Sequence, residues 1–384
     1  MGHAPRIAII GAGMGGLVAY SALRQRGIDS HIFEQAPHFL RLGAGIQMSP
    51  NAMRVLRSLG LEERVKATAF RPGSWKNRTW DTGAMQFELP LGDAASARYG
   101  ADYLLMHRGD LHEALVSIVP DEAISLDRRV VGIETRSDGV EITFQDGTRT
   151  SADIVVGADG VHSRVRETLL GPEKPDYTGR VAYRATFPVE RLSMEIDECT
   201  KWWGEDRHIV IYLTTAARDE VYFVTSLPEP DWTLESWSAK GDVDVLRSAF
   251  ASFHPQVRDV LRACPEVNKW AIVDRKPLPH WQDGRMVILG DAAHPMTPYM
   301  AQGAAMAMED GVMLARCIAE TPDDVAGALA RFEATRQARA ARVQAGSHAN
   351  TWMRERTDPD WCYGYDVLNA PIASGDRALN AAAG

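Results

Sequence analysis

Apolar and polar segments alternate most clearly in the first forty residues. A continuous apolar run at 7–10 predicts a strand that is buried on both faces. Apolar residues at helical spacing predict a helix over 17–26, and a second strand is expected at 28–33. Strand, turn, helix and strand form the repeating unit of a doubly wound α/β sheet, so the chain is expected to begin with one.

The remaining apolar patterns are of two kinds. The segment 179–272 contains apolar strands separated by polar, turn-rich stretches, which predicts an antiparallel sheet with one buried face. The segments on either side of it alternate between helical and strand patterns. Helices are predicted at 51–59, 108–119, 243–253, 304–318 and 325–345, and strands at 140–144, 154–156, 182–187, 208–214, 221–225 and 286–289.

These patterns predict an α/β fold of two interleaved domains, and the length of 384 residues suits two domains better than one core. The last ten residues are small and polar enough to be disordered. The predicted parts are a Rossmann-like domain of 1–70, 100–178 and 275–365, a substrate domain of 71–99 and 179–274 built on the antiparallel sheet, and a tail of 366–384.

Charge and cysteine content narrow the classes of function. The net charge of −9 argues against nucleic acid as a partner. No apolar run reaches the ~20 residues of a membrane span, and the strand at 7–10 leaves no room for a signal peptide, so a cytoplasmic protein is expected. The cysteines have no metal-ligand spacing, and we expect no bound metal and reduced thiols at Cys199, Cys264, Cys317 and Cys362.

A glycine-rich turn follows the first strand and indicates a dinucleotide site. Gly11 permits the tight turn, Gly13 lets the backbone approach a pyrophosphate, and Gly16 lets the helix pack closely on the strand. The helix start, which includes Gly15, offers free N–H groups to the phosphates. Glu34 ends the second strand, where a carboxylate can accept both ribose hydroxyls, and this favours FAD or NAD over NADP.

Two further motifs each follow an apolar strand. The first is GADGVHSRVR at 157–166, and the second is GDAAHP at 290–295, which continues to QGA at 302–304 and ED at 309–310. Together with the glycine turn, these motifs resemble those of the single-component flavoprotein aromatic hydroxylases in order and in separation. The resemblance extends over essentially the whole chain.

This resemblance implies an FAD cofactor and assigns contacts to it. Asp291 would bind the ribityl chain, with the start of the following helix at the flavin pyrimidine. Asp159 would serve both the FAD pyrophosphate and NAD(P)H. The other implied contacts are Arg108 at the pyrophosphate, Gln35 and Arg41 at the adenosine, the backbone of Val130 at the adenine, and Pro295 through Gly303 and Ala304 at the flavin.

Several of these residues also have an interpretation that needs no cofactor. Asp291 can cap the next helix, Asp159 can be a turn residue, and Arg166 can be a solvated helix charge. His294 can be a catalytic base, but the resemblance favours a role in shaping the loop over the flavin, where Pro295 fixes φ.

The resemblance also implies the reaction. NADH, preferred over NADPH, would reduce FAD, and oxygen would add to give a flavin C4a-hydroperoxide that hydroxylates an electron-rich ring. A hydroxyl substituent activates the ring, and a carboxylate on the attacked carbon would leave as CO₂. The expected partners are therefore a small hydroxylated aromatic or heteroaromatic carboxylate and O₂, with a homodimer as the commonest kind of assembly.

The substrate side of the site is expected on the antiparallel sheet. Tyr212 matches an active-site tyrosine of the family, and His208 shares its strand face because side chains of alternate residues point the same way. Tyr222 on the neighbouring strand is a third candidate, and each of the three can instead be a half-buried sheet residue. Pro295 and Met296 would border the substrate from the flavin side.

One position departs from a relative that acts on a hydroxylated pyridinecarboxylate. That relative has a histidine base where this chain has Gln47, and glutamine hydrogen-bonds but accepts no proton. Either the substrate differs, for example hydroxypicolinate or salicylate, or it is the same and His208 or Tyr212 handles the proton. We hypothesise that Gln47 binds a polar group of the substrate beside the flavin.

Three other classes of protein share part of these features. A flavin reductase has similar acidic motifs, and an NAD-dependent dehydrogenase has a similar glycine turn but no use for the motif at 285–303. A flavin-binding module without enzymatic activity is the third. Oxygen consumption coupled to NADH oxidation would distinguish the hydroxylase from all of them.

Overall fold

A parallel sheet is built around the first apolar run. The computed structural model describes residues 5–41, 44–231 and 239–374, so the segment predicted to be disordered, 375–384, lies outside the described residues. The strand at 7–10 is central in its sheet and buried along its length, as predicted. The sheet order is β18 (Met286–Ile288), β11 (Ile154–Gly157), β1 (Ile7–Ile10), β2 (Ser30–Phe33) and β7 (Ile124–Ser125), and all neighbours are parallel.

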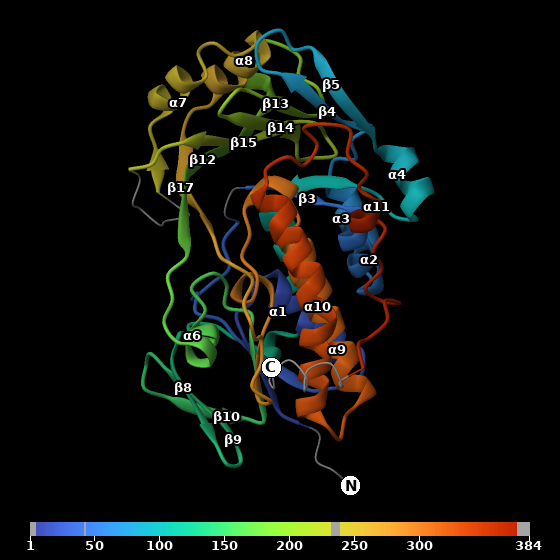
Figure 1. Cartoon of the computed structure of the whole chain (residues 1–384), viewed down its shortest axis with the longest axis vertical. Coiled ribbons are helices and arrows are strands. Elements are labelled where there is room, and N and C mark those ends of the chain that lie inside the picture. The colour runs from blue at the N-terminus through green and yellow to red at the C-terminus, as the bar shows by residue number, and fades with distance from the viewer. Residues whose placement is uncertain (1–4, 42–43, 232–238, 375–384) are drawn as a thin grey trace.

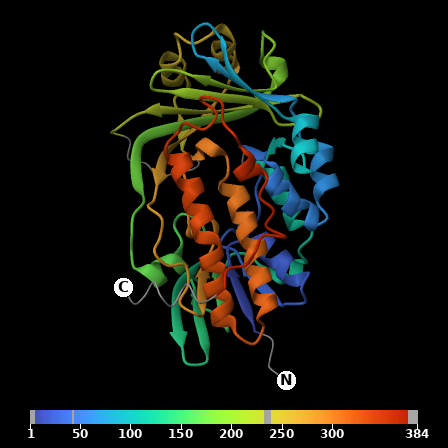
Figure 2. The same cartoon turned by 45° about the vertical axis from the view of Figure 1, so that its right-hand side comes forward.

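Long helices pack beside this sheet. Two of them are in close contact at a glycine, where a side chain would not fit. Helix α1 (Met14–Arg24) packs along α9 (Gly303–Glu320), and a Cβ on Gly311 would lie 2.7 Å from the backbone nitrogen of Ala19. Helix α9 packs in turn on α10 (Val325–His348), and both views show the two helices side by side in the middle of the molecule (Figures 1 and 2). The start of α9 is thereby fixed relative to the glycine turn.

A second, eight-stranded sheet forms the end of the molecule that is uppermost in Figure 1. It contains the sheet predicted over 179–272 and two further strands from 74–90, and the pair β4–β13 is parallel, so the sheet is mixed. Its order is β16 (Lys240–Gly241), β17 (Val267–Asp274), β12 (Asp176–Pro188), β15 (Glu220–Pro228), β14 (His208–Leu213), β13 (Cys199–Trp203), β4 (Ser74–Thr79) and β5 (Met85–Pro90).

Shorter elements lie between and beside the two sheets. A two-stranded antiparallel sheet of β3 and β6, which the sequence patterns did not predict, carries Gln47. The bounds of the other strands are β3 (Gly45–Met48), β6 (Leu104–His107), β8 (Val130–Arg136), β9 (Gly139–Phe144) and β10 (Arg149–Ala152). The other helices are α2 (Pro50–Ser58), α3 (Glu62–Thr68), α4 (Gly92–Tyr99), α5 (Arg108–Val116), α6 (Arg164–Leu170), α7 (Val243–Ala249), α8 (Pro255–Ala263) and α11 (Asp360–Tyr363), with 3₁₀ turns η1 (Asp121–Ala123), η2 (Val189–Arg191), η3 (Gly290–Ala292) and η4 (Pro298–Met300).

One predicted helix is wrong in its length. The stretch 243–253 was expected to be a single helix, but α7 ends at Ala249 and α8 begins at Pro255. The His254 side chain accepts a hydrogen bond from the second residue of α8, and proline fits the first turn of a helix, where no N–H partner is needed. Among the described helices, none is long and apolar enough to cross a membrane.

Candidate active site

The glycine turn from Gly11 to Gly16 and the start of α1 form a cradle. Its backbone is accessible at Gly13, where a phosphate group could approach. Gly11 has a φ of 105°, and a Cβ on Gly16 would lie only 2.0 Å from the Gly11 carbonyl oxygen, so both positions require glycine. By contrast, a Cβ on Gly13 would meet no atom within 4 Å. Helix α1 starts at this point with no side-chain cap and no acid in its first turn. Its free N–H groups therefore suit an anion.

The carboxylate of Glu34 is fixed at the edge of this cradle. It accepts hydrogen bonds from the backbone N–H groups of Ala12, at 2.7 Å, and Ala36, at 2.8 Å. Two of the predicted adenosine contacts differ in whether the side chain already has a partner. Arg41 is already bound to Asp110 at 2.6 Å, whereas Gln35 is exposed. The contacts of Gln35, Arg41 and Val130 with a nucleotide stay predictions.

The second motif connects two parts of the site. Asp159 accepts hydrogen bonds from the Ser163 hydroxyl at 2.5 Å and from the backbone N–H of Arg164 at 2.7 Å, so its carboxylate supports the start of α6, whose N-cap residue is Ser163. Arg166 is not the solvated charge considered above. It is buried and donates to the carbonyl oxygens of Val161 at 2.7 Å and Ala292 at 3.2 Å, which joins the second motif to the third.

The third motif places Asp291 beside the start of α9. Its side chain is exposed to solvent, yet the surrounding protein desolvates it enough to raise the pKa of its carboxyl. Its Oδ1 lies 3.9 Å from the position of a Cβ on Gly303, the first residue of α9. Helix α9 begins after Gln302, so Asp291 does not cap it. Arg108 is exposed, makes no hydrogen bond or ion pair to a described residue, and lies near enough to lower the pKa of Asp291.

The residues of the three motifs fit FAD. The open space at Gly13 and the uncapped start of α1 suit a pyrophosphate, and the uncommitted Arg108 cation supplies a counter-charge. Asp291 offers a carboxylate for hydroxyl groups, next to the uncapped start of α9. We therefore expect the cradle at Gly13 to hold the diphosphate and Asp291 to hold the sugar-alcohol chain.

His294 has a structural role in the described chain. It is completely buried, and its Nε2 lies 2.5 Å from Oδ2 of Asp310. The same carboxylate accepts from the backbone N–H of Gly290 at 3.0 Å and from Arg336 at 2.7 Å. Burial alone would raise the pKa of Asp310, but His294 and Arg336 outweigh it and hold that pKa far below its usual range. The turn that presents Asp291 is thus anchored to two helices.

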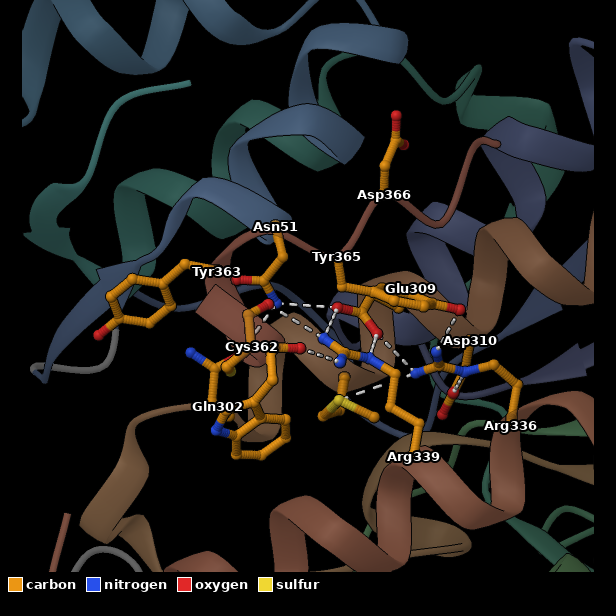
Figure 3. Close-up of polar contacts among 12 residues, drawn as sticks. Asn51, Gln302, Glu309, Asp310, Arg336, Arg339, Cys362, Tyr363, Tyr365 and Asp366 are labelled. Atoms are coloured by element: carbon orange, nitrogen blue, oxygen red, sulfur yellow. Dashed lines mark hydrogen bonds and ion pairs between the residues drawn. The ribbon is translucent and has the colours of Figure 1, made fainter. Parts of the chain in front are cut away.

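A neighbouring carboxylate anchors the loop before α9 (Figure 3). Glu309 binds Arg339 at 2.8 Å and Arg336 at 2.8 Å, and it accepts a hydrogen bond from Asn51 at 2.8 Å. Asn51 also donates to the amide oxygen of Gln302 at 3.0 Å. Asn51 lies at the start of α2, shortly after the end of β3. The network therefore connects the strand that carries Gln47 to the loop 295–303.

Three predicted substrate residues, Gln47, Tyr212 and Tyr222, meet where β3 packs against the eight-stranded sheet. Tyr212 and Tyr222 are register partners on β14 and β15, with ring centroids 4.9 Å apart. The strand with Gln47 lies directly against them, because a Cβ on Gly45 would lie 2.6 Å from the Tyr212 hydroxyl. Gln47 accepts a hydrogen bond from the Tyr103 hydroxyl at 2.5 Å, and its contact with Tyr212 lowers the pKa of that tyrosine. Burial dominates and raises the Tyr212 pKa well above its usual value.

His208 lies on the same face but at a distance from this group. It is four residues from Tyr212 along β14, which corresponds to about 13 Å in an extended strand. Its ring lies 5.3 Å from that of Tyr299, and burial lowers the pKa of its imidazole well below the usual value. The structure therefore does not bring His208 and Gln47 to one point. They lie near opposite ends of one surface, with Val210 between them.

The structure adds residues to the site that the patterns did not single out. Tyr103 directly precedes β6, whose pairing with β3 only the tertiary structure reveals. Arg184 shares the inner face with Tyr222, since its partner Val224 alternates with Tyr222, and its guanidinium stacks on Trp270 at 4.3 Å. Lys201 is fully buried on this face. The period-two pattern of the strands was the signal that could have found Arg184 and Lys201.

Comparison with known proteins agrees with this geometry. Residues 5–347 match the model of a family described as FAD binding domain, and the chain belongs to that family. It is 47% identical to 6-hydroxynicotinate 3-monooxygenase of Pseudomonas fluorescens over 376 residues, which cover 97% of this chain and 98% of the relative. It is 46% identical to the enzyme of the same name from Bordetella bronchiseptica, at 97% and 98% coverage.

Solved structures show the same fold. Klebsiella pneumoniae HpxO in complex with FAD and uric acid has a TM-score of 0.81 at 27% identity, covering 98% of this chain and 95% of that chain. The predicted α/β fold, the FAD cofactor and the class of flavoprotein aromatic hydroxylase are thereby confirmed, and the chain is a FAD-dependent monooxygenase. The individual cofactor and substrate contacts stay predictions.

Proposed function

We propose that this monooxygenase hydroxylates a six-membered aromatic ring that carries a hydroxyl and a carboxylate at opposite positions, with loss of the carboxylate as CO₂. The inner face of β14 is the observation that supports this. It carries a polar side chain near each end, Tyr212 and His208, whose backbone positions are about 13 Å apart along the strand. Two polar groups at opposite ends of one face suit a ring whose hydroxyl and carboxylate are at opposite positions.

The 6-hydroxynicotinate 3-monooxygenases support the same proposal, because 6-hydroxynicotinate has this arrangement of substituents. The product would then be 2,5-dihydroxypyridine. Salicylate and 6-hydroxypicolinate are the alternatives. Salicylate carries the two groups on adjacent ring atoms and 6-hydroxypicolinate carries them on either side of the ring nitrogen, so in both compounds the groups lie closer together than in 6-hydroxynicotinate. We also propose NADH as the electron donor.

Bound FAD would supply the electrons and the site at which oxygen is activated. The chain's own residues bind and orient the ring. At one end, the Gln47 amide nitrogen and the Tyr212 hydroxyl can both donate to the ring oxygen. Tyr212 stays protonated at neutral pH because burial raises its pKa. These two donors would stabilise the ionised form of the substrate's ring hydroxyl by hydrogen bonding. Neither of them would take up its proton directly.

The remaining residues exclude water and fix the geometry. The Tyr212 and Tyr222 rings and the loop 295–303 enclose the space, and Tyr222, like Gln47, is buried. The network through Asn51, Gln302 and Glu309 keeps the Gln47 strand at a constant distance from that loop. A ring held between them would present one carbon to the flavin side.

The test is oxygen uptake by the FAD-loaded protein with NADH and a panel of hydroxylated benzoates and pyridinecarboxylates. Product and CO₂ are quantified together. Stoichiometric 2,5-dihydroxypyridine and CO₂ from 6-hydroxynicotinate are the expected result. Coupled turnover of salicylate or 6-hydroxypicolinate in its place would overturn the opposite-position substrate. NADH oxidation that no aromatic compound stimulates would instead favour a reductase or a flavin-binding module.

A further inference from the structure

A lysine is buried inside the substrate-side face with no acid beside it. Lys201 on β13 is 2% exposed, and its Nζ makes no hydrogen bond or ion pair to any residue that the structure describes. It lies 3.8 Å from the ring centroid of Trp203 and 5.9 Å from that of Tyr299. Lysine is almost never fully buried unless it is paired, because desolvation of an ammonium ion is costly.

The register of the sheet places this lysine at the His208 end of the surface. Trp203 pairs with His208 and Lys201 pairs with Val210, so Lys201 and His208 are diagonal neighbours on one face. Both also contact the ring of Tyr299, which belongs to the loop 295–303 on the flavin side. The amine therefore lies where the sheet meets that loop.

The other charged groups around this end are also cationic. Arg180 on β12 donates to the Ser226 hydroxyl at 2.8 Å, and that hydroxyl lies 2.9 Å from the Tyr299 hydroxyl. The guanidinium of Arg354 lies 5.7 Å from the centroid of the Trp203 ring. Asp274 acts on Tyr299 but is itself held by His348. No carboxylate of a described residue is bound to Lys201 or His208, so the cluster lacks an anion.

We propose that Lys201 is the counter-ion of the substrate carboxylate and thereby decides that the enzyme takes carboxylated rings. This inference rests on the proposed function and extends it, since it assigns the carboxylate to the His208 end and the ring hydroxyl to the Gln47 end. The neutral imidazole of His208 can donate an N–H to the same carboxylate. The two groups would then recognise the anion together.

This role has a consequence for protons. Burial lowers the pKa of Lys201 to about 7, so near neutral pH the free protein holds the amine partly unprotonated. A bound carboxylate favours the ammonium form and raises that pKa, so binding takes up a proton. Affinity for the carboxylate is full below the free pKa and falls as the pH rises above it. A lysine with a merely structural role would show no such proton uptake.

The experiment measures binding to the FAD-loaded protein without NADH, so that no turnover is required. The probes are 6-hydroxynicotinate and 2-hydroxypyridine, which lacks the carboxylate. Calorimetry in buffers of different ionisation enthalpy reports protons taken up, and flavin absorbance reports affinity. At pH 7.5 we expect binding of 6-hydroxynicotinate to take up more protons than binding of 2-hydroxypyridine, which has the same ring hydroxyl.

Two variants and one control complete the design. Lys201→Met should weaken 6-hydroxynicotinate by about 30-fold and change 2-hydroxypyridine by no more than about twofold. Lys201→Arg should keep the affinity and abolish the proton uptake, because arginine does not titrate. The control is Lys269→Met, which removes a buried lysine of the same sheet that stacks on Tyr183 and is paired with Glu229 at 2.6 Å. It should change neither probe.

The outcomes separate the two proposals. Equal weakening of both probes by Lys201→Met, or equal proton uptake by the wild-type protein with the two probes, would overturn the role of Lys201 even if product forms. Should Lys201→Met not fold, the wild-type proton uptake and Lys201→Arg still decide. Proton-linked binding without any hydroxylated product would leave the role of Lys201 standing and refute the proposed function.

Discussion

Replacing Gly13 with alanine should separate cofactor binding from folding. A Cβ at this position meets no atom within 4 Å, so the methyl group causes no clash in the free protein. Alanine lowers the entropy of the unfolded chain, which stabilises, but it is a poorer residue than glycine at the start of a helix, which Gly13 occupies. These two effects oppose each other, and we expect the free energy of unfolding without FAD to change by less than about 1 kcal/mol.

The same methyl group would fill the space that a diphosphate needs. Loss of two charge-assisted hydrogen bonds from the backbone N–H groups costs about 3 kcal/mol, which corresponds to roughly 150-fold weaker FAD binding. The assay is fluorescence titration of the FAD-free protein, together with urea unfolding of the same samples. Gly16→Ala is the matched control, because its Cβ would lie 2.0 Å from the Gly11 carbonyl oxygen and should destabilise the free protein itself. An unchanged FAD affinity in Gly13→Ala would refute the assignment of the cradle to the diphosphate.

Three other changes test the acid network and the substrate end. Asp310→Asn should lower the free energy of unfolding by about 3–5 kcal/mol, measured in urea, because it leaves buried Arg336 short of one partner. Since the folded-state pKa of Asp310 is lowered, its contribution is present above the unfolded pKa and is lost as the pH falls toward the folded value, so an acid titration of stability should be flatter in the variant. Gln47→His should raise the rate of product formation from 6-hydroxynicotinate and add a titrating group near pH 6.5 to its pH profile; an unchanged profile would contradict the placement of Gln47 at the ring oxygen. Tyr212→Phe should lower kcat/KM by about 10–100-fold while FAD affinity stays the same, and equal loss of both would point to misfolding instead.

The local chemistry of the cofactor side could be predicted from the sequence because it depends on short segments. The glycine turn needs positive φ at Gly11 and a missing Cβ at Gly16, and both requirements arise from neighbours in the chain or in the adjoining strand. A helix that starts after such a turn exposes its N–H groups whatever else surrounds it. For the same reason the strands at 7–10 and 154–156 could be read from apolar runs of a few residues.

The substrate side was predictable only in part. Alternation along β14 correctly placed Tyr212 and His208 on one face, since the period of a strand is two residues. It did not show that they serve opposite ends of a surface. The residues at the Tyr212 end, Gln47 and Tyr103, come from β3 and from the residue before β6, and a two-stranded pairing of short segments leaves little trace in the hydrophobic pattern.

What the sequence by itself determined is the class of fold, the cofactor turn and those strands with a clear apolar or alternating run, such as β1, β11 and β14, because backbone geometry and burial of such runs depend on the order of residues along the chain. The strands β4, β5 and β13 of the eight-stranded sheet were not predicted. What only the tertiary structure decided is which charges are compensated. The sequence leaves the role of His294 open, and only the structure places Asp310 against it, with Arg336 on the same carboxylate. Lys201 is one of seven lysines, and only the structure shows that it is buried with no carboxylate of a described residue bound to it. Electrostatic environment is set by residues far apart in the chain, and a folded core is needed to bring them within a few ångströms.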